Sequence, residues 1–130
     1  MALSNKKIGN TFEEELCELL SQNGFWAHNL AQNEVGQPAD IIAVKNNYSV
    51  LIDCKVCSKD RFDVNRIEPN QEAAMTMWKV KGNQSCYFAL KLSDGEIYMV
   101  HFDNLKENLN KNQITLTFED WLGDMECLLK

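Results

Sequence analysis

Residues 40–56 read DIIAVKNNYSVLIDCKV and decide the fold. Two apolar runs, over 40–44 and 49–56, flank the pair Asn46-Asn47, which favours the tight turn of a β-hairpin. The stretch therefore predicts two antiparallel strands that lie side by side. The second run is long and strongly apolar, which is typical of the central strand of a sheet.

The sequence before the hairpin predicts one helix and one strand. Apolar side chains recur with helical spacing from Phe12 to Leu20, and Gly24 is a natural end for this helix. Residues 25–30 have strand composition, and the polar residues 31–37 predict a loop.

The sequence after the hairpin predicts a second helix and two further strands. Residues 57–68 are polar and predict a loop, after which Pro69 suits the first turn of a helix that ends near Gly82. Strands are expected over 86–92 and 97–102, with a turn between them.

The last third of the chain predicts one short strand and a closing helix. The strand is expected at Ile114-Thr115-Leu116. The helix would be amphipathic, with an apolar side formed by Phe118, Trp121, Leu122, Met125, Leu128 and Leu129. The element order predicts an α/β protein in which helices flank a mixed sheet around one layered core.

The composition is that of an ordinary globular protein. The chain has 130 residues, of which 45% are hydrophobic and 25% charged, and this suits a single domain over residues 1–130. No run approaches the ~18 apolar residues of a membrane span, and the first residues lack the apolar core of a signal peptide. We therefore expect a cytoplasmic protein with no membrane partner. The net charge of −6 is opposite in sign to that of proteins that coat nucleic acid.

Five cysteines without a secretory signal predict reduced thiols. Cys54 and Cys57 form a C-x-x-C pair, a spacing found in redox and zinc sites. A zinc site would need a second Cys or His pair at similar spacing, and a thioredoxin-like pair should begin a helix. Ordinary thiols are therefore the favoured interpretation, and a functional C-x-x-C pair is the alternative.

Two charged side chains interrupt the apolar second strand of the hairpin. Asp53 and Lys55 lie two positions apart and so share one face of the strand. Charges in a buried strand are costly unless they are paired or bound to a metal. One interpretation is a structural ion pair on a half-exposed face, and the other is a functional site.

Asp40 provides a second carboxylate close to Asp53. Asp40 and Asp53 lie at equal separations from the Asn46-Asn47 turn, so the hairpin brings them together at its open end. Neighbouring carboxylates repel unless a cation lies between them, and oxygen ligands suit Mg²⁺ or Mn²⁺. The pair therefore predicts a divalent metal site.

The first helix offers a third acid. At about 100° of rotation per residue, Glu13 borders the apolar face that contains Phe12, whereas Glu14 and Glu18 lie on the opposite side. The alternative role for Glu13 is a favourable interaction of its negative charge with the positive N-terminal end of the helix. That role would apply equally to Glu14 and Glu15.

These residues together resemble a known nuclease signature. Pro38-Ala39-Asp40 and, after twelve residues, Asp53-Cys54-Lys55 resemble the motif of the PD-(D/E)XK nucleases, with Ala inserted between Pro and Asp. Residues 9–25 look like the first helix of Holliday junction resolvases of the archaeal Hjc and bacterial RecU type. Gln71 matches a glutamine often found in the helix after the active strand. The resemblance covers residues 6–92.

The resemblance implies a restriction-endonuclease-like fold, with a central mixed β-sheet flanked by helices, and metal-dependent hydrolysis of phosphodiester bonds in DNA. Asp40, Asp53 and the backbone carbonyl of Cys54 would hold Mg²⁺, which Mn²⁺ could replace. Glu13 would contact a second ion or a water on the first. Lys55 would position the attacking water or stabilise the transition state.

Gln71 would orient the same attacking water by a hydrogen bond. A polar residue that merely faces solvent in the first turn of its helix is the alternative. The sequence leaves both roles open.

The implied substrate is branched DNA, above all the four-way junction. Symmetric cutting of a junction needs two active sites in a two-fold relation, so we expect a homodimer. Sparse basic side chains would then form a DNA-contacting rim despite the net charge, and an ordinary solvated surface is the alternative. The candidate rim comprises Lys6, Lys7, Lys45, Lys59, Arg61, Arg66, Lys79 and Lys81.

Residues 28–33 read HNLAQN and lack the Arg and Ser that the junction-resolving type usually carries there. Two alternatives therefore stay open. One is a related nuclease that acts on other DNA structures or ends. The other is a catalytically silent module of the same fold that binds nucleic acid or protein.

Overall fold

The computed structural model describes residues 5–30, 37–59, 61–62, 66–82, 85–107 and 114–115. Helices and strands succeed one another in nearly the order that the sequence predicts. They are α1 (Asn5–Gln22), β1 (Trp26–Asn29), β2 (Ile41–Lys45), β3 (Tyr48–Cys57), β4 (Arg61–Phe62), α2 (Pro69–Val80), β5 (Ser85–Leu92), β6 (Ile97–His101), α3 (Phe102–Glu107) and β7 (Ile114–Thr115).

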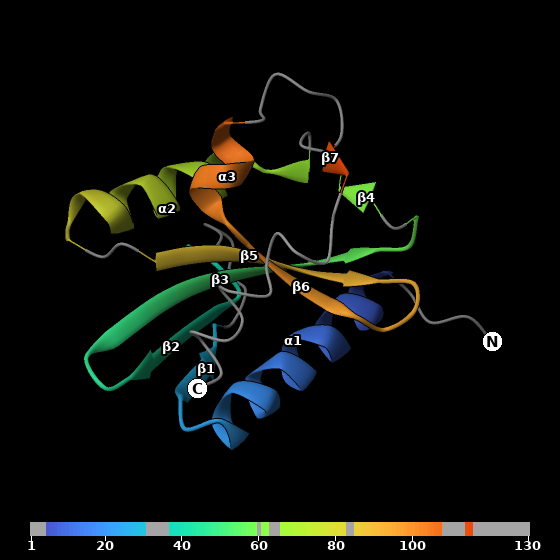
Figure 1. Ribbon diagram of the computed structural model, residues 1–130, viewed down its shortest axis with the longest axis horizontal. Coiled ribbons are helices and arrows are strands. Elements are labelled where there is room, and N and C mark those ends of the chain that lie inside the picture. The colour runs from blue at the N-terminus through green and yellow to red at the C-terminus, as the bar shows by residue number, and fades with distance from the viewer. Residues whose placement is uncertain are drawn as a thin grey trace.

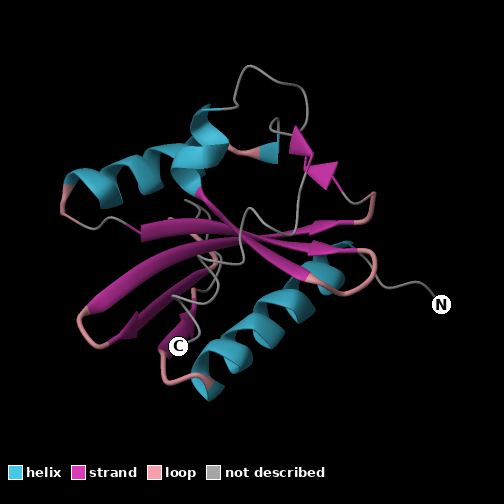
Figure 2. Cartoon of the chain, in the orientation of Figure 1, coloured by secondary structure: helices cyan, strands magenta, loops and turns pink. Residues whose placement is uncertain are grey.

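A five-stranded mixed sheet forms the middle layer of the fold, as Figure 2 shows. Its strand order is β1-β2-β3-β5-β6, and β3 and β5 are parallel while the other neighbouring pairs are antiparallel. Helix α1 lies across one face of this sheet, and α2 and α3 lie over the other (Figure 1). The expected α/β fold with helices on both faces of a mixed sheet is thus confirmed.

Each face of the sheet carries its own apolar core. On the α1 side, Leu16 packs in one cluster with Val50 and Ile52 of β3. On the α2 side, Met75 packs in another cluster with Leu51. Because successive strand residues point to opposite faces, β3 supplies both cores and is buried along most of its length.

The hairpin has the register that the sequence predicts. Asn46 and Asn47 both have positive φ, at 50° and 66°. Positive φ at both central residues is typical of a type I′ turn, whose twist matches that of the flanking strands. Lys45 pairs with Tyr48 next to the turn, and Ile41 pairs with Ile52 at the far end. The open end of the hairpin therefore lies one residue beyond that last pair.

Helix α1 begins seven residues before the predicted apolar face. Lys7, Asn10 and Thr11 in this stretch are exposed and Ile8 is its one large apolar residue, so the hydrophobic pattern does not indicate these first turns. The Thr11 hydroxyl donates a 2.8 Å hydrogen bond to the carbonyl of Lys7 within this stretch. Gly24, at φ 92°, ends the helix region as expected. None of the helices in the described ranges is long and apolar enough to cross a membrane.

Two predictions for the second half of the chain are wrong. The segment 57–68, expected to be a loop, contains the end of β3 and the strand β4, which pairs with β7. Phe102, expected to end a strand, instead begins α3 and is buried with Leu105. Phe102 and Leu105 are the apolar residues of this six-residue helix, which is too few to produce a recognisable helical pattern among the polar residues. Leu116 and the predicted closing helix lie outside the described residues.

Candidate active site

The hairpin places Asp40 directly across from Asp53. Asp40 precedes β2, and continuing the register by one residue sets it opposite Asp53 of β3. The backbone N–H of Asp40 donates to the carbonyl of Ile52 at 3.1 Å. Asp40 Oδ2 accepts a 2.7 Å hydrogen bond from the backbone N–H of Cys54. The backbone of β3 therefore fixes the Asp40 carboxylate next to Asp53.

Asp53 is the most deeply buried of the acidic side chains, at 1% exposure. Its Oδ1 accepts a 3.1 Å hydrogen bond from Nε2 of Gln71. Its Oδ2 lies 3.4 Å from Nζ of Lys55 and accepts no hydrogen bond from the described residues. The two oxygens thus have different environments, and Oδ2 is the one left with coordination capacity.

Gln71 is buried and contacts the acid, which excludes the solvent-facing alternative. It is the third residue of α2, where its Oε1 accepts a 3.1 Å hydrogen bond from the backbone N–H of Glu68. This capping arrangement orients the amide so that its nitrogen faces Asp53. In this structure Gln71 therefore holds the carboxylate itself. Glu68 was missed in the sequence, although Glu68-Pro69-Asn70-Gln71 has the spacing of a capping box.

Glu13 is buried on the α1 side, whereas Glu14 and Glu18 are exposed, as the helical rotation predicts. Burial, the charge of Asp40 and a side-chain hydrogen bond with Asp40 together raise the pKa of Glu13 to about 7. Glu13 is thus a direct neighbour of Asp40. The site draws its acids from both α1 and the hairpin.

Buried negative charge accumulates here with little to balance it. Burial raises the pKa of Asp53, and the nearby charge of Asp40 raises it again, while Lys55 opposes both effects. Lys55 is itself mostly buried, with 14% of its side chain exposed. Among the described residues, Lys55 is ion-paired with Asp53, while Asp40 and Glu13 add two further buried carboxyl groups close by, an arrangement that an additional cation would stabilise.

The donors present suit a magnesium ion held by few side chains. Asp53 Oδ2 is a buried carboxylate oxygen that accepts no hydrogen bond from the described residues, and Asp40 lies beside it. Mg²⁺ is commonly bound by one or two carboxylates, with waters and phosphate oxygens completing its shell. Within the described ranges, no three His, Cys, Asp or Glu side chains form a group that could enclose an ion. The donors therefore suit an open site in which the carboxylates of Asp40 and Asp53 hold the ion.

The C-x-x-C pair does not form a common site. Cys54 packs against the α1-side core, whereas Cys57 lies in the α2-side core, so the two side chains point to opposite faces of β3. Both are free thiols. Burial raises the pKa of the Cys54 thiol well above its usual value, which disfavours the reactive thiolate.

Several members of the candidate basic rim have partners within the chain. Lys45 Nζ donates to the carbonyl of Asn23 at 2.7 Å, and Arg66 donates to the carbonyl of Val56 at 2.8 Å. Lys79 forms an ion pair with Asp103. These side chains therefore have structural contacts whether or not DNA is bound.

Comparison with known proteins places this geometry in a family. A family model described as archaeal Holliday junction resolvase (Hjc) matches residues 4–126. The chain belongs to the archaeal Holliday junction resolvase family.

The members of the archaeal Holliday junction resolvase family are nucleases, so the resemblance found in the sequence is confirmed. The fold is similar to a solved structure of Archaeoglobus fulgidus Hjc, a Holliday junction resolvase from an archaeal hyperthermophile. The TM-score is 0.64 at 20% sequence identity, over 85% of this chain and 88% of that chain. No curated protein sequence matches the chain. The roles of individual residues stay predictions.

Proposed function

We propose that the chain is a Mg²⁺-dependent endonuclease that resolves four-way DNA junctions in recombination and repair. The observation that carries this proposal is the environment of Asp53 in a member of a nuclease family. Its carboxylate is buried beside Asp40 and Lys55 and is oriented by Gln71, and one of its oxygens accepts no hydrogen bond from the residues that the structure describes.

We assign the ion-binding role to Asp40, Asp53 and the backbone carbonyl of Cys54, with Mn²⁺ as a substitute for Mg²⁺. Glu13, as the neighbour of Asp40, would contact a second ion or a water. When bound, the ion neutralises charge on the scissile phosphate and makes water more acidic.

The protein's own side chains orient and stabilise the reacting groups. The Gln71 amide occupies Asp53 Oδ1 and so leaves Oδ2 for the ion. Lys55 keeps its amine next to that oxygen, at 3.4 Å, where it can donate to a phosphate that enters the site. A positive group preorganised in a mostly buried position stabilises the charge that develops in the transition state more than it would in water.

The proposed substrate also requires a pair of sites. Cutting a junction symmetrically needs two active centres related by a two-fold axis, so we propose a homodimer. The pairing of two copies would also bring their basic side chains together and so offset the net charge of −6 per chain.

The experiment that tests the function compares four-way junction, linear duplex and single-stranded DNA side by side, each with Mg²⁺ and with EDTA. We expect cleavage of the junction with Mg²⁺ only. Equal cleavage of duplex or of DNA ends would favour a related nuclease of another specificity. Binding of DNA without any cleavage would favour the catalytically silent module.

A further inference from the structure

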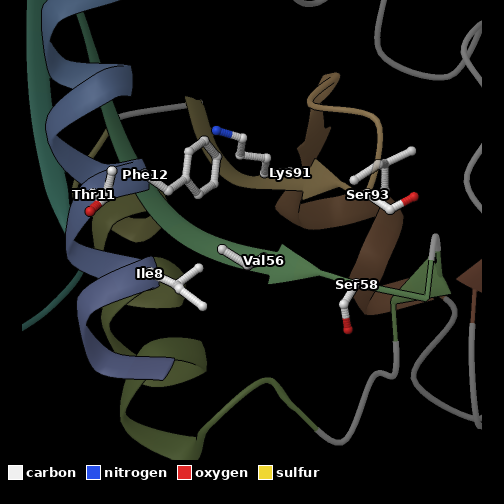
Figure 3. A pocket seen from close by; sticks show the side chains of 8 residues that line it. Ile8, Thr11, Phe12, Val56, Ser58, Lys91 and Ser93 are labelled. Atoms are coloured by element: carbon white, nitrogen blue, oxygen red, sulfur yellow. The ribbon is translucent and has the colours of Figure 1, made fainter. Parts of the chain in front are cut away.

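A pocket of about 410 Å³ opens on the α1 side of the sheet, and none of the roles assigned above uses it. Figure 3 shows its two walls. One wall is α1, with Phe12 at its base, and the other is formed where β3 and β5 end, with Val56 and Lys91 side by side. Ser58 and Ser93 line the outer end.

The position of this pocket is typical of ligand sites in sheets of this kind. Strands β3 and β5 are parallel, with Val56 paired to Lys91, so Ser58 and Ser93 follow the carboxyl ends of two adjacent parallel strands. Ligands of open α/β sheets bind outside such carboxyl ends.

The pocket is formed by the same helix and the same strand that carry residues of the candidate active site. Phe12 is the chain neighbour of Glu13, and Val56 is the chain neighbour of Lys55. Because successive strand residues face opposite sides, Val56 faces the pocket while Lys55 faces the other side of the sheet. A ligand in the pocket would therefore lie within one or two residues of the catalytic groups along both α1 and β3.

The lining combines an apolar base with one cation and several hydroxyls. The Lys91 amine lies 5.7 Å from the centre of the Phe12 ring and forms an ion pair with Glu15 at 2.5 Å. Glu15 is the more exposed partner, at 45%, so a phosphate could replace it at the amine without opening the core.

We propose that this pocket receives one unpaired nucleotide of the DNA substrate, with a phosphate at Lys91 and the base against the apolar wall. The proposal rests on the proposed function in one respect, namely that the substrate is DNA. The volume suits a single nucleotide rather than a base pair. A continuous duplex keeps its bases stacked and cannot supply such a nucleotide. A bulge supplies one directly, and a four-way junction supplies one when a base pair at its branch point opens, where stacking is interrupted. The pocket would therefore select for interrupted DNA.

The test measures binding without metal, so it does not depend on cleavage. Anisotropy titrations compare a labelled duplex with the same duplex carrying a single-nucleotide bulge. The native protein should prefer the bulged duplex by about tenfold, the scale of one nucleobase contact. Equal affinity of the native protein for the two duplexes would overturn the proposal.

Two matched variants separate the amine from its ion pair. Lys91→Gln and Glu15→Gln each break the same contact, so a purely structural role would give the same change in both. We expect Lys91→Gln to abolish most of the preference for the bulge, and Glu15→Gln to retain or increase it. Equal effects of the two variants would overturn the assignment of Lys91.

A second pair of variants tests the cavity itself. Thr11→Trp would fill the pocket from α1, and Ser21→Trp places the same side chain at an exposed position of the same helix. Only Thr11→Trp should remove the preference. If Thr11→Trp instead changed the oligomeric state and kept the preference, a second copy of the chain would be the occupant and the proposal would fail. Absence of Mg²⁺-dependent cleavage, with the preference intact, would contradict the proposed function alone.

Discussion

The amide nitrogen of Gln71 on α2 donates a 3.1 Å hydrogen bond to Oδ1 of Asp53 on β3. The bond joins the helix on one face of the sheet to the central strand. The other end of the Gln71 amide is held by the backbone N–H of Glu68, so its orientation is fixed from both sides. The start of α2 thereby sets the direction in which the Asp53 carboxylate faces.

Replacing Gln71 by Ala should therefore affect turnover more than substrate binding. The variant loses the donor to Asp53 and the capping contact, so we expect kcat for junction cleavage to fall about tenfold with KM nearly unchanged. The free energy of unfolding should decrease by about 1–2 kcal/mol. Steady-state kinetics and denaturant titration measure the two effects. Asn70→Ala, at an exposed neighbouring position, is the control, and a KM effect equal to the kcat effect would contradict the positioning role.

Replacing Lys55 by Ala should remove turnover while Mg²⁺ binding persists. The amine lies beside Asp53 but is not an oxygen ligand, so its loss removes charge stabilisation and leaves the carboxylates in place. We expect cleavage to slow by roughly a hundredfold or more. Single-turnover cleavage measures the first effect and a Mg²⁺ thermal titration measures the second, with exposed Glu96→Ala as the control. Cleavage at the native rate would rule out a catalytic Lys55.

Mg²⁺ should stabilise the protein, and more so at pH 8 than at pH 6. Burial and the neighbouring acids raise the pKa of Glu13 to about 7 and that of Asp53 to about 8, so at pH 6 both groups are mostly protonated. At pH 8 Glu13 has lost most of its proton and Asp53 about half, so the carboxylates repel more and the ion competes with fewer protons. At ten times its Kd, Mg²⁺ should add about 1.4 kcal/mol, or roughly 4 °C in Tm.

Scanning fluorimetry at constant ionic strength measures this gain. Asp53→Asn should reduce it at pH 8, because the variant lacks one of the proposed oxygen ligands. A larger gain at pH 6 than at pH 8, or an unchanged gain in Asp53→Asn, would place the ion elsewhere.

The chain should sediment as two copies at micromolar concentration. Trp26, on the edge strand β1, is 62% exposed, and Met77 and Val80 present apolar surface on α2, so two faces are available for pairing. Junction binding should weaken steeply as salt rises if the dimer joins the basic side chains of both copies. A monomer by sedimentation velocity, both free and on a junction, would contradict symmetric cutting by a dimer.

The sequence predicts the hairpin and its acids well because their relationship is local. Two asparagines define the turn, the turn sets the register, and the register brings Asp40 to Asp53. The burial of Glu13 follows in the same way from the rotation of one helix.

Long-range packing is what the sequence conceals. Nothing near Gln71 in the chain indicates that α2 packs over the face of the sheet that carries Asp53. A solvent-facing Gln71 was therefore an equal alternative. Helix α3 was missed because Phe102 and Leu105 are buried against distant strands while their neighbours are polar. The pocket beside Lys91 depends on the parallel pairing of β3 and β5. These two strands are far apart in the sequence, so no local pattern indicates that they pair.

The most direct test of the active-site assignment is the cleavage rate of Asp53→Asn on a four-way junction at matched Mg²⁺. The amide is nearly the same size as the carboxylate, and its oxygen can still accept the hydrogen bond from Gln71, so the fold and junction binding should persist. Junction binding should be equal or tighter, because a negative charge near the phosphates is lost. We expect cleavage to fall by at least about a hundredfold, while Asp94→Asn in an exposed turn cleaves normally. Native-rate cleavage by Asp53→Asn would show that the catalytic centre lies elsewhere.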